Sequence, residues 1–127
     1  MIQAESQSQD FLTHFTNGDQ EGIADTTSDK GGSNQGFRPH ELLEAALASC
    51  MNITLRMTAQ QMGIALSQVR VSVSLDRSSP DRSTFGYSVV FPDSLSEPEQ
   101  QTLLAAIENC PVRNTLSKGL WFTRIDD

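Results

Sequence analysis

The long apolar segment at residues 39–62 is the feature that most constrains how this chain can fold. Pro39 is tolerated in the first turn of a helix and Gly63 is a common stop signal, so the pattern predicts one helix from residue 39 to about residue 62. At 1.5 Å per residue it would be about 36 Å long. Apolar residues recur along it at spacings of three and four: Leu43, Ala46, Leu47, Cys50, Ile53 and Met57. We therefore expect a buried central helix.

Segments of alternating apolar and polar residues predict strands on both sides of this helix. The clearest alternation covers residues 69–75, and a second covers residues 85–91. Their short connection favours an antiparallel pair. Residues 11–15 and 22–26 are weaker strand candidates separated by a turn at residues 17–19, so they could form another hairpin.

A second helix is predicted to begin after Ser96, with Glu99 completing a capping box. Cys110 shares its apolar face, and Pro111 is expected to end or bend the helix there. Residues 120–125 are predicted to form a last strand. The resulting order, ββ-α-ββ-α-β, indicates an α+β fold with an antiparallel sheet.

The length of 127 residues fits a single domain over residues 1–127, with residues 1–9 as a frayed polar tail. A net charge of −7 disfavours binding to the phosphate backbone of nucleic acids. No apolar run approaches the roughly 20 residues needed to span a bilayer, and the N-terminus lacks a secretory signal. We expect a cytoplasmic protein with neither a membrane nor a nucleic-acid partner.

Two cysteines, Cys50 and Cys110, are too few for a disulfide scaffold or a thiolate zinc site. His14 and His40 are the only histidines and have no paired spacing, so neither a metal nor a cofactor is expected. One interpretation is that both cysteines are small buried hydrophobes. In the other, one thiolate reduces a peroxide and becomes a sulfenic acid, which the second thiol converts to a disulfide. That reaction requires the two Cα atoms to approach within about 7 Å.

The position of Cys50 in the middle of a helix raises the question of how its thiol would be activated. A helix N-terminus cannot help there, so a cation from another segment would be needed. The candidates are Arg38, Arg56 and Arg113. At the helix entrance, His40 or Glu41 could orient Arg38 or accept a proton, or Glu41 could simply be a favourable acid in a first helical turn. The glycine-rich loop at residues 31–36 lacks a phosphate-binding pattern.

Two motifs resemble the OsmC/Ohr family. Residues 39–50, PHELLEAALASC, resemble the family signature P-x-E-L-L-x-A-A-L-x-x-C, and residues 51–57 resemble its T-L-R-M continuation. Residues 109–116, NCPVRNTL, resemble the C-P-V-x-x-T-L signature around the second cysteine of the family. The glycine-rich loop stands just before the first helix, as in the family, and the resemblance extends over residues 11–125.

This resemblance implies an OsmC-like α+β fold in which two chains intertwine into a homodimer around the long helix. It implies a thiol peroxidase that reduces organic hydroperoxides in oxidative stress defence, with Cys50 peroxidatic and Cys110 resolving. It also implies that no metal or flavin takes part, and that a dithiol, such as a protein-bound lipoyl group, is the reductant.

The chain departs from the family pattern at the activating arginine. Well-characterised members use an arginine of the N-terminal sheet region, held by a glutamate just after the helix-opening proline. Here that position is His40, followed by Glu41, and residues 11–36 contain no arginine. Arg38 is the nearest substitute. An alternative function is therefore a binding or redox-sensing module that holds a small apolar or electrophilic ligand at the dimer interface, and a third is a structural dimer in which both cysteines only pack.

Overall fold

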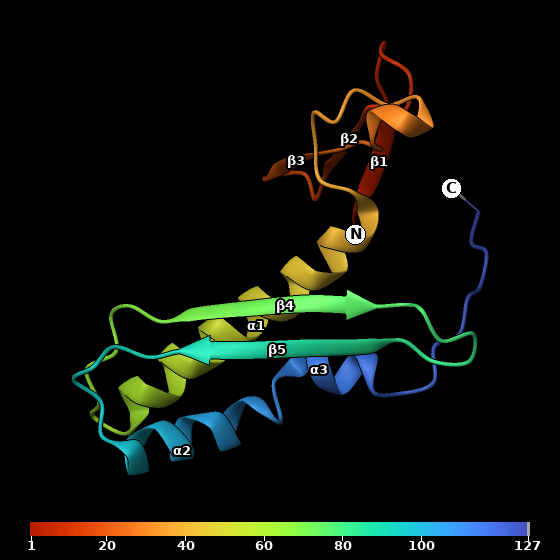
Figure 1. Cartoon of the computed structure of the whole chain (residues 1–127). Helices are drawn as coiled ribbons and strands as arrows, with labels where there is room; N and C mark the ends of the chain where they lie inside the picture. Colours follow the sequence, from red (N-terminus) through yellow and green to blue (C-terminus); the bar gives the residue numbers. More distant parts are fainter. Residues whose placement is uncertain (127) are drawn as a thin grey trace. The chain divides into compact units, whose positions relative to one another are not determined.

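The computed structural model describes residues 1–126 and shows an α+β chain with two small antiparallel sheets and three α-helices (Figure 1). In chain order the elements are β1 Gln3–Ser6, β2 Thr13–Thr16, β3 Glu21–Ala24, the 3-10 turn η1 Ser28–Lys30, α1 Pro39–Gln61, β4 Arg70–Asp76, β5 Thr84–Val90, α2 Glu97–Ile107 and α3 Pro111–Leu116. The chain divides into two compact units, unit 1 from Met1 to Leu43 and unit 2 from Glu44 onward.

Unit 1 is built on a three-stranded sheet in the order β1-β2-β3. The predicted hairpin is confirmed, because β2 and β3 pair antiparallel. The frayed tail predicted at residues 1–9 is wrong in part, since β1 pairs with β2 from Gln3 opposite Thr16 to Ser6 opposite Thr13. All four side chains of β1 are exposed, so backbone pairing alone orders this strand and the sequence carries no hydrophobic alternation to reveal it.

The glycine-rich loop of unit 1 folds back against β3. Phe37 forms a parallel bridge with Ala24, and its N–H donates to the carbonyl of Ile23 at 3.1 Å. A Cβ atom on Gly36 would lie 2.6 Å from that same carbonyl oxygen, so only glycine permits this close approach. The glycines of the loop therefore serve backbone packing within unit 1.

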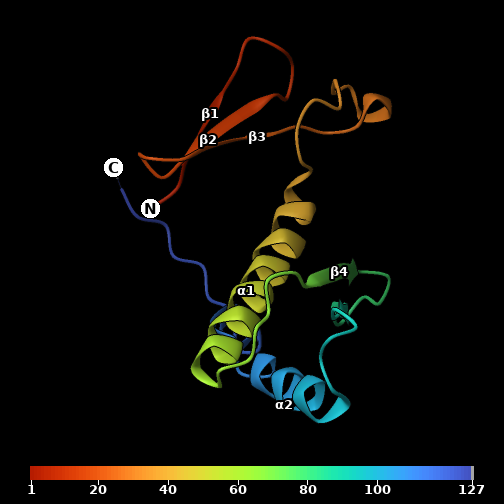
Figure 2. The ribbon, with the colours of Figure 1, turned by 90° about the vertical axis from the view of Figure 1, so that its left-hand side faces the viewer.

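Unit 2 contains the hydrophobic core. The predicted long helix is confirmed as α1, which contributes Leu47, Met51, Leu55 and Ala59 to the core. The remaining buried members come from α2 and its flanking residues: Leu95, Leu103, Ile107 and Cys110. Figure 2 shows α1 and α2 beside one another in this unit.

The predicted core stripe of α1 is only partly right. The buried residues follow an i, i+4 line from Leu47 to Ala59, whereas Ile53 and Met57 are 48% and 58% exposed. The helix is apolar on more than one face, so its sequence periodicity could not tell which face would be covered.

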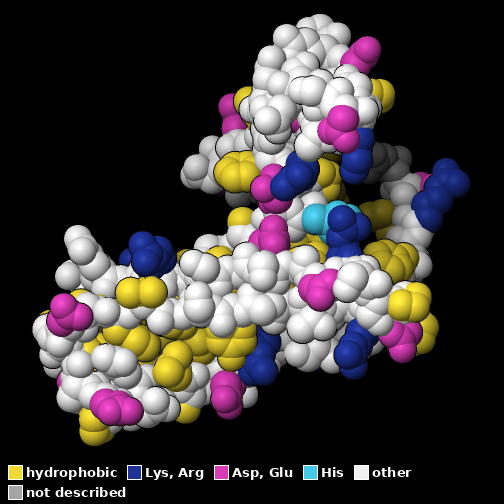
Figure 3. Space-filling model, viewed as in Figure 1, with side chains coloured by type: hydrophobic (Ala, Val, Ile, Leu, Met, Phe, Trp, Pro, Cys, Tyr) yellow, Lys and Arg dark blue, Asp and Glu magenta, His cyan; other side chains and the backbone are white. Residues whose placement is uncertain are grey.

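The antiparallel pair predicted from residues 69–75 and 85–91 is confirmed as β4 and β5, paired from Arg70 opposite Val90 to Asp76 opposite Thr84. Alternate side chains of this hairpin pack against the core, and Figure 3 shows hydrophobic side chains between the hairpin and α2.

Two hydrogen bonds attach the hairpin to α1. The Asn52 amide donates to the carbonyl of Val69 at 3.0 Å, and a Glu44 carboxylate oxygen accepts the N–H of Leu75 at 2.7 Å.

The capping box predicted for the second helix is confirmed, because Ser96 and Glu99 bond reciprocally at the start of α2. The predicted position of Cys110 within that helix is wrong. Helix α2 ends at Ile107, and Cys110 is the N-cap of α3 with Pro111 as its first residue. Proline starts a helix more readily than it continues one, so Pro111 begins a new helix here.

The strand predicted at residues 120–125 is not formed. Among the described residues this segment has no strand beside it, and Trp121 and Phe122 are 91% and 94% exposed. Among the described residues, no helix is long and apolar enough to cross a membrane.

Candidate thiol site

The two cysteines come together in unit 2. Cys110 is completely buried, whereas Cys50 is only partly buried and packs against the same core cluster. Both are free thiols, and the Cys50 side chain is close enough to act on the Cys110 thiol. The structure thus places a partly buried thiol and a completely buried thiol in the same apolar core.

Burial is the main influence on Cys110 and raises the pKa of its thiol above the ordinary value, and the neighbouring Cys50 raises it further. Arg113 acts in the opposite direction through its backbone N–H and its charge. The thiol form of Cys110 is therefore favoured at rest.

The helix-entrance residues behave differently from one another. A Glu41 carboxylate oxygen accepts the backbone N–H of Arg38 at 2.9 Å and lies 3.3 Å from the Arg38 Nε. The Arg38 backbone N–H, and then its guanidinium, hold the pKa of Glu41 below its ordinary value. His40 is exposed and forms no side-chain hydrogen bond or ion pair within residues 1–126. Glu41, rather than His40, is thus the residue that orients Arg38.

Arg38, His40 and Glu41 belong to unit 1, and both cysteines belong to unit 2. Each group is well defined within its own unit. The proposed influence of Arg38 on the Cys50 thiol therefore stays a prediction.

The other two candidate arginines lie in unit 2. The Arg56 Nε donates to the Asn52 side chain at 2.8 Å, so this arginine is tied to its own helix. Arg113 is partly buried in α3, and its Nη1 donates to the carbonyl of Glu108 at 2.5 Å. The Arg113 charge is one of the influences that lower the pKa of Cys110.

Asp25 is a polar centre that the sequence analysis missed. It is only 3% exposed, and its carboxylate accepts the backbone N–H groups of Thr26, Ser33 and Gln35 at 2.7, 3.2 and 3.1 Å. The Gln35 N–H is the largest influence lowering the Asp25 pKa. An aspartate directly before a loop rich in glycine and small polar residues was the available signal, since such side chains often cap backbone amides.

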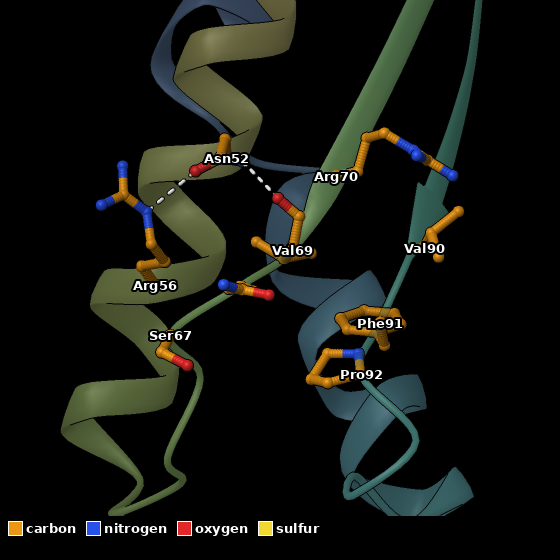
Figure 4. A pocket seen from close by; sticks show the side chains of 9 residues that line it. Asn52, Arg56, Ser67, Val69, Arg70, Val90, Phe91 and Pro92 are labelled. Atoms are coloured by element: carbon orange, nitrogen blue, oxygen red, sulfur yellow. Dashed lines mark hydrogen bonds between the residues drawn. The ribbon is translucent and has the colours of Figure 1, made fainter.

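The structure also contains a groove of about 470 Å³ at the open end of the hairpin, lined by α1, the connection to β4, and the end of β5. In Figure 4, Asn52 lies between Arg56 and Val69 and is joined to both, while the Arg56 and Arg70 side chains point away from one another. Neither cysteine lines this groove, so it is separate from the thiol pair.

A smaller cavity of about 200 Å³ lies between α1, β5 and α3, with Leu47, Met51 and Arg113 among its walls. The Arg113 side chain therefore borders a cavity in unit 2.

Among the described residues, no three His, Cys, Asp or Glu side chains gather in a way that could hold a metal ion.

Comparison with protein families matches residues 32–124 to the model of the OsmC-like protein family. This range includes both cysteines, the helix entrance and most of unit 2. Comparison with curated proteins finds no match.

Solved structures with the same fold come from several bacteria. One, described as an osmotic stress induced and detoxification response protein of Psychrobacter arcticus 273-4, is 24% identical with a TM-score of 0.76, and the match covers 90% of this chain and 85% of that one. The organic hydroperoxide resistance protein OsmC of Legionella pneumophila is 22% identical with a TM-score of 0.66, covering 92% and 88%. OhrB of Bacillus subtilis, an organic hydroperoxide resistance protein, is 22% identical with a TM-score of 0.64, covering 92% and 89%.

Proposed function

Because the chain belongs to the OsmC-like protein family, we propose that it is a cysteine-based peroxidase that reduces organic hydroperoxides in oxidative stress defence. The observation that supports this function is the pairing of a partly exposed thiol, Cys50, with a fully buried one, Cys110, in one apolar core. Two of the similar structures are organic hydroperoxide resistance proteins.

In the oxidative half of the reaction, the Cys50 thiolate attacks the outer oxygen of the hydroperoxide. The O–O bond breaks, the alkoxide leaves and takes up a proton as the alcohol, and Cys50 becomes a sulfenic acid. The Cys110 thiolate then attacks the Cys50 sulfur, so that an S–S bond forms and hydroxide leaves to become water. Because Cys110 is completely buried, peroxide in solvent cannot reach its thiol, which therefore reacts with the Cys50 sulfur instead.

In the reductive half, an external dithiol, such as a lipoyl-type group, attacks the accessible Cys50 sulfur and is itself oxidised to a disulfide. The cytoplasm is the proposed setting, since its dithiols would return both cysteines to the reduced state.

A homodimer completes the proposal. Ile53 and Met57 form an exposed apolar face on α1, and Leu120, Trp121 and Phe122 are exposed in the C-terminal segment. Large apolar side chains exposed one helical turn apart, or in succession along a segment, are candidates for an interface. A second copy of the chain is the proposed cover, and the molar mass measured by light scattering tests it.

Titration of thiols tests the proposed chemistry. Reduced protein treated with cumene hydroperoxide should lose both thiols for each peroxide consumed, because the two are joined in one disulfide. Cys50→Ser should consume no peroxide, whereas Cys110→Ser should form sulfenic acid at Cys50 and proceed to sulfinic acid under excess peroxide. Loss of no thiol at modest peroxide excess would refute the peroxidase function.

A binding or redox-sensing module is the second candidate. The pairing of Arg38 with Glu41 and the absence of arginine from residues 11–36 favour it, because both leave Cys50 without an evident activating cation in unit 1. Such a module would form the disulfide only slowly with hydroperoxides but would react with electrophiles. Comparing the rates of thiol loss with cumene hydroperoxide and with iodoacetamide distinguishes the two functions.

A further inference from the structure

The cavity of about 200 Å³ between α1, β5 and α3 combines buried apolar walls with a single positive charge. Leu47 and Met51 of α1 are 2% and 0% exposed and form part of its apolar lining. Phe85 of β5 and Leu116 of α3 are partly buried and extend this lining. Neither cysteine belongs to the walls, so the cavity is distinct from the thiol pair. Its lining favours an apolar group over water.

Arg113 supplies the charge. Its side chain is partly buried, and its Nη1 donates to the carbonyl of Glu108 at 2.5 Å, an acceptor without net charge. Among residues 1–126 no carboxylate forms an ion pair with Arg113, and the walls of the cavity include neither Asp nor Glu. Partial burial of a cation costs free energy unless an anion lies beside it. The charge on this wall is therefore matched by no charge of opposite sign.

Hydroxyl groups complete the polar part of the cavity. They belong to Ser83, Tyr87 and Ser117, which are all exposed and so lie at its opening to solvent. The Ser117 hydroxyl donates to the carbonyl of Arg113 at 2.7 Å, which leaves the hydroxyls of Ser83 and Tyr87 to donate to a ligand. A few polar donors beside an apolar lining are typical of a small-molecule site.

Volume and charge together limit what could bind there. Pockets that hold drug-sized ligands measure about 300–1,000 Å³, so a cavity of about 200 Å³ suits a single ring or a short alkyl chain. A guanidinium binds a planar carboxylate through two parallel N–H bonds, and Arg113 has used only one of its donors. The net charge of −7 opposes multiply charged anions, so one cation in the cavity is best matched by a monoanion.

We propose that this cavity binds a small monocarboxylate. The carboxylate pairs with Arg113 and accepts from the hydroxyls at the opening, while the ring or alkyl chain packs on Leu47 and Met51. The proposal goes beyond the proposed peroxidase function and does not depend on it, because neither thiol is needed to hold the ligand.

Titration of isotope-labelled reduced protein with benzoate, followed through its backbone amide resonances, tests this site. In the wild type, saturable shifts should be concentrated in residues 83–87 and 113–117, which carry the walls from β5 and α3. Arg113→Gln should weaken binding about tenfold or more, because it removes a charge-assisted contact. Arg70→Gln removes an exposed arginine of β4 that does not line the cavity, so it should keep the wild-type affinity.

Two further probes of the wild type test the site without any variant, so the result does not depend on whether Arg113→Gln folds. Benzyl alcohol has the same ring without the charge and should bind about tenfold or more weakly than benzoate. Anthracene-9-carboxylate keeps the charge but exceeds the cavity, so it should not cause these shifts. All titrations are made at one ionic strength, set with sodium chloride, so that general screening of charge is the same in each.

Several results would overturn the site. They are the absence of saturable shifts with benzoate up to about 10 mM, equal affinity of the wild type and a folded Arg113→Gln, an equal loss in Arg70→Gln, and equal binding of benzoate with either of the other probes. The titration contains no peroxide and consumes no thiol. Its failure therefore leaves the peroxidase function untouched, and the thiol titration with cumene hydroperoxide decides that function separately.

Discussion

Units 1 and 2 are held together by opposite kinds of interaction. Unit 1 buries only Ala24 and Asp25, and its loop is organised by the three backbone amides that Asp25 accepts. Unit 2 is organised by eight buried apolar residues from α1, α2 and their flanks. The two thiols of the proposed redox chemistry thus lie in the apolar unit, where ionising a sulfur costs more free energy and a neighbouring cation has more influence than in water.

The arginines repeat this contrast. Arg38 in unit 1 is about half exposed and already paired with Glu41, whereas Arg113 in unit 2 is partly buried and bonded to a neutral carbonyl. Pairing with Glu41 and contact with solvent weaken the electric field of Arg38, whereas Arg113 is less exposed and its Nη1 donates to a carbonyl that carries no net charge.

The largest expected effect lies in the apolar core. Leu55→Ala should lower the free energy of unfolding by about 2–5 kcal/mol, because it opens a cavity at a completely buried position of α1. Ile53→Ala, two residues away and 48% exposed, should change it by only about 0.5 kcal/mol in an isolated chain. Urea denaturation checks both, and a loss at Ile53 as large as that at Leu55 would mean that another chain covers this face.

A smaller effect is expected from the titration of Cys110. Because its pKa is raised in the folded state, the folded protein holds this proton more tightly than the unfolded chain does. The resulting stability is complete below the ordinary thiol pKa of about 8.5 and is lost as pH rises through the higher folded value. The slope for one proton is at most about 1.4 kcal/mol per pH unit. Urea denaturation of the wild type from pH 7 to pH 10 should show this loss of stability with rising pH, and the loss should be smaller in Cys110→Ala.

A local effect is expected at the polar centre of unit 1. Asp25→Asn should speed hydrogen exchange of the Ser33 and Gln35 amides, because an amide oxygen is a weaker acceptor than a carboxylate. The Asp25 pKa is lowered in the folded state, so its contribution is present above about pH 4 and is lost as pH falls below that value. Wild type and variant should therefore converge at low pH. Asp19→Asn, in an exposed turn of the same unit, should leave these amides unchanged.

The smallest effect is expected at the helix entrance. Glu41→Gln should barely change the midpoint of thermal unfolding, since exposed ion pairs contribute little. The informative measurement is the rate at which the Glu41→Gln variant forms sulfenic acid at Cys50. A clear decrease would support the predicted role of Arg38 at Cys50 and would mean that both units contribute to the thiol chemistry.

Much of this architecture was predictable from local patterns. The long helix, the β4–β5 hairpin and the capping box at Ser96 and Glu99 all follow from signals within a few residues, and all are confirmed. What failed depends on partners: β1 is ordered only by pairing with β2, and residues 120–125 pair with no strand among residues 1–126. Hydrophobic periodicity describes a segment and says nothing about what will lie against it.

The site was predictable to the same degree. Sequence motifs identified both cysteines, but the proximity of Cys50 to Cys110 depends on how α1 and α2 pack. Arg113 was considered only for Cys50, because Cys110 was expected inside a helix that in fact ends at Ile107. Reading Pro111 as the first residue of a new helix would have placed Arg113 within one turn of Cys110.

The exposed C-terminal segment has a spectroscopic consequence. Trp121 is the single tryptophan of the chain and is 91% exposed. Its fluorescence in an isolated chain should have the red-shifted emission of a water-exposed indole, with ready quenching by iodide. Burial of the indole against another protein surface would shift the emission to the blue and protect it from iodide, so the natural sequence already carries a label-free probe of its own assembly.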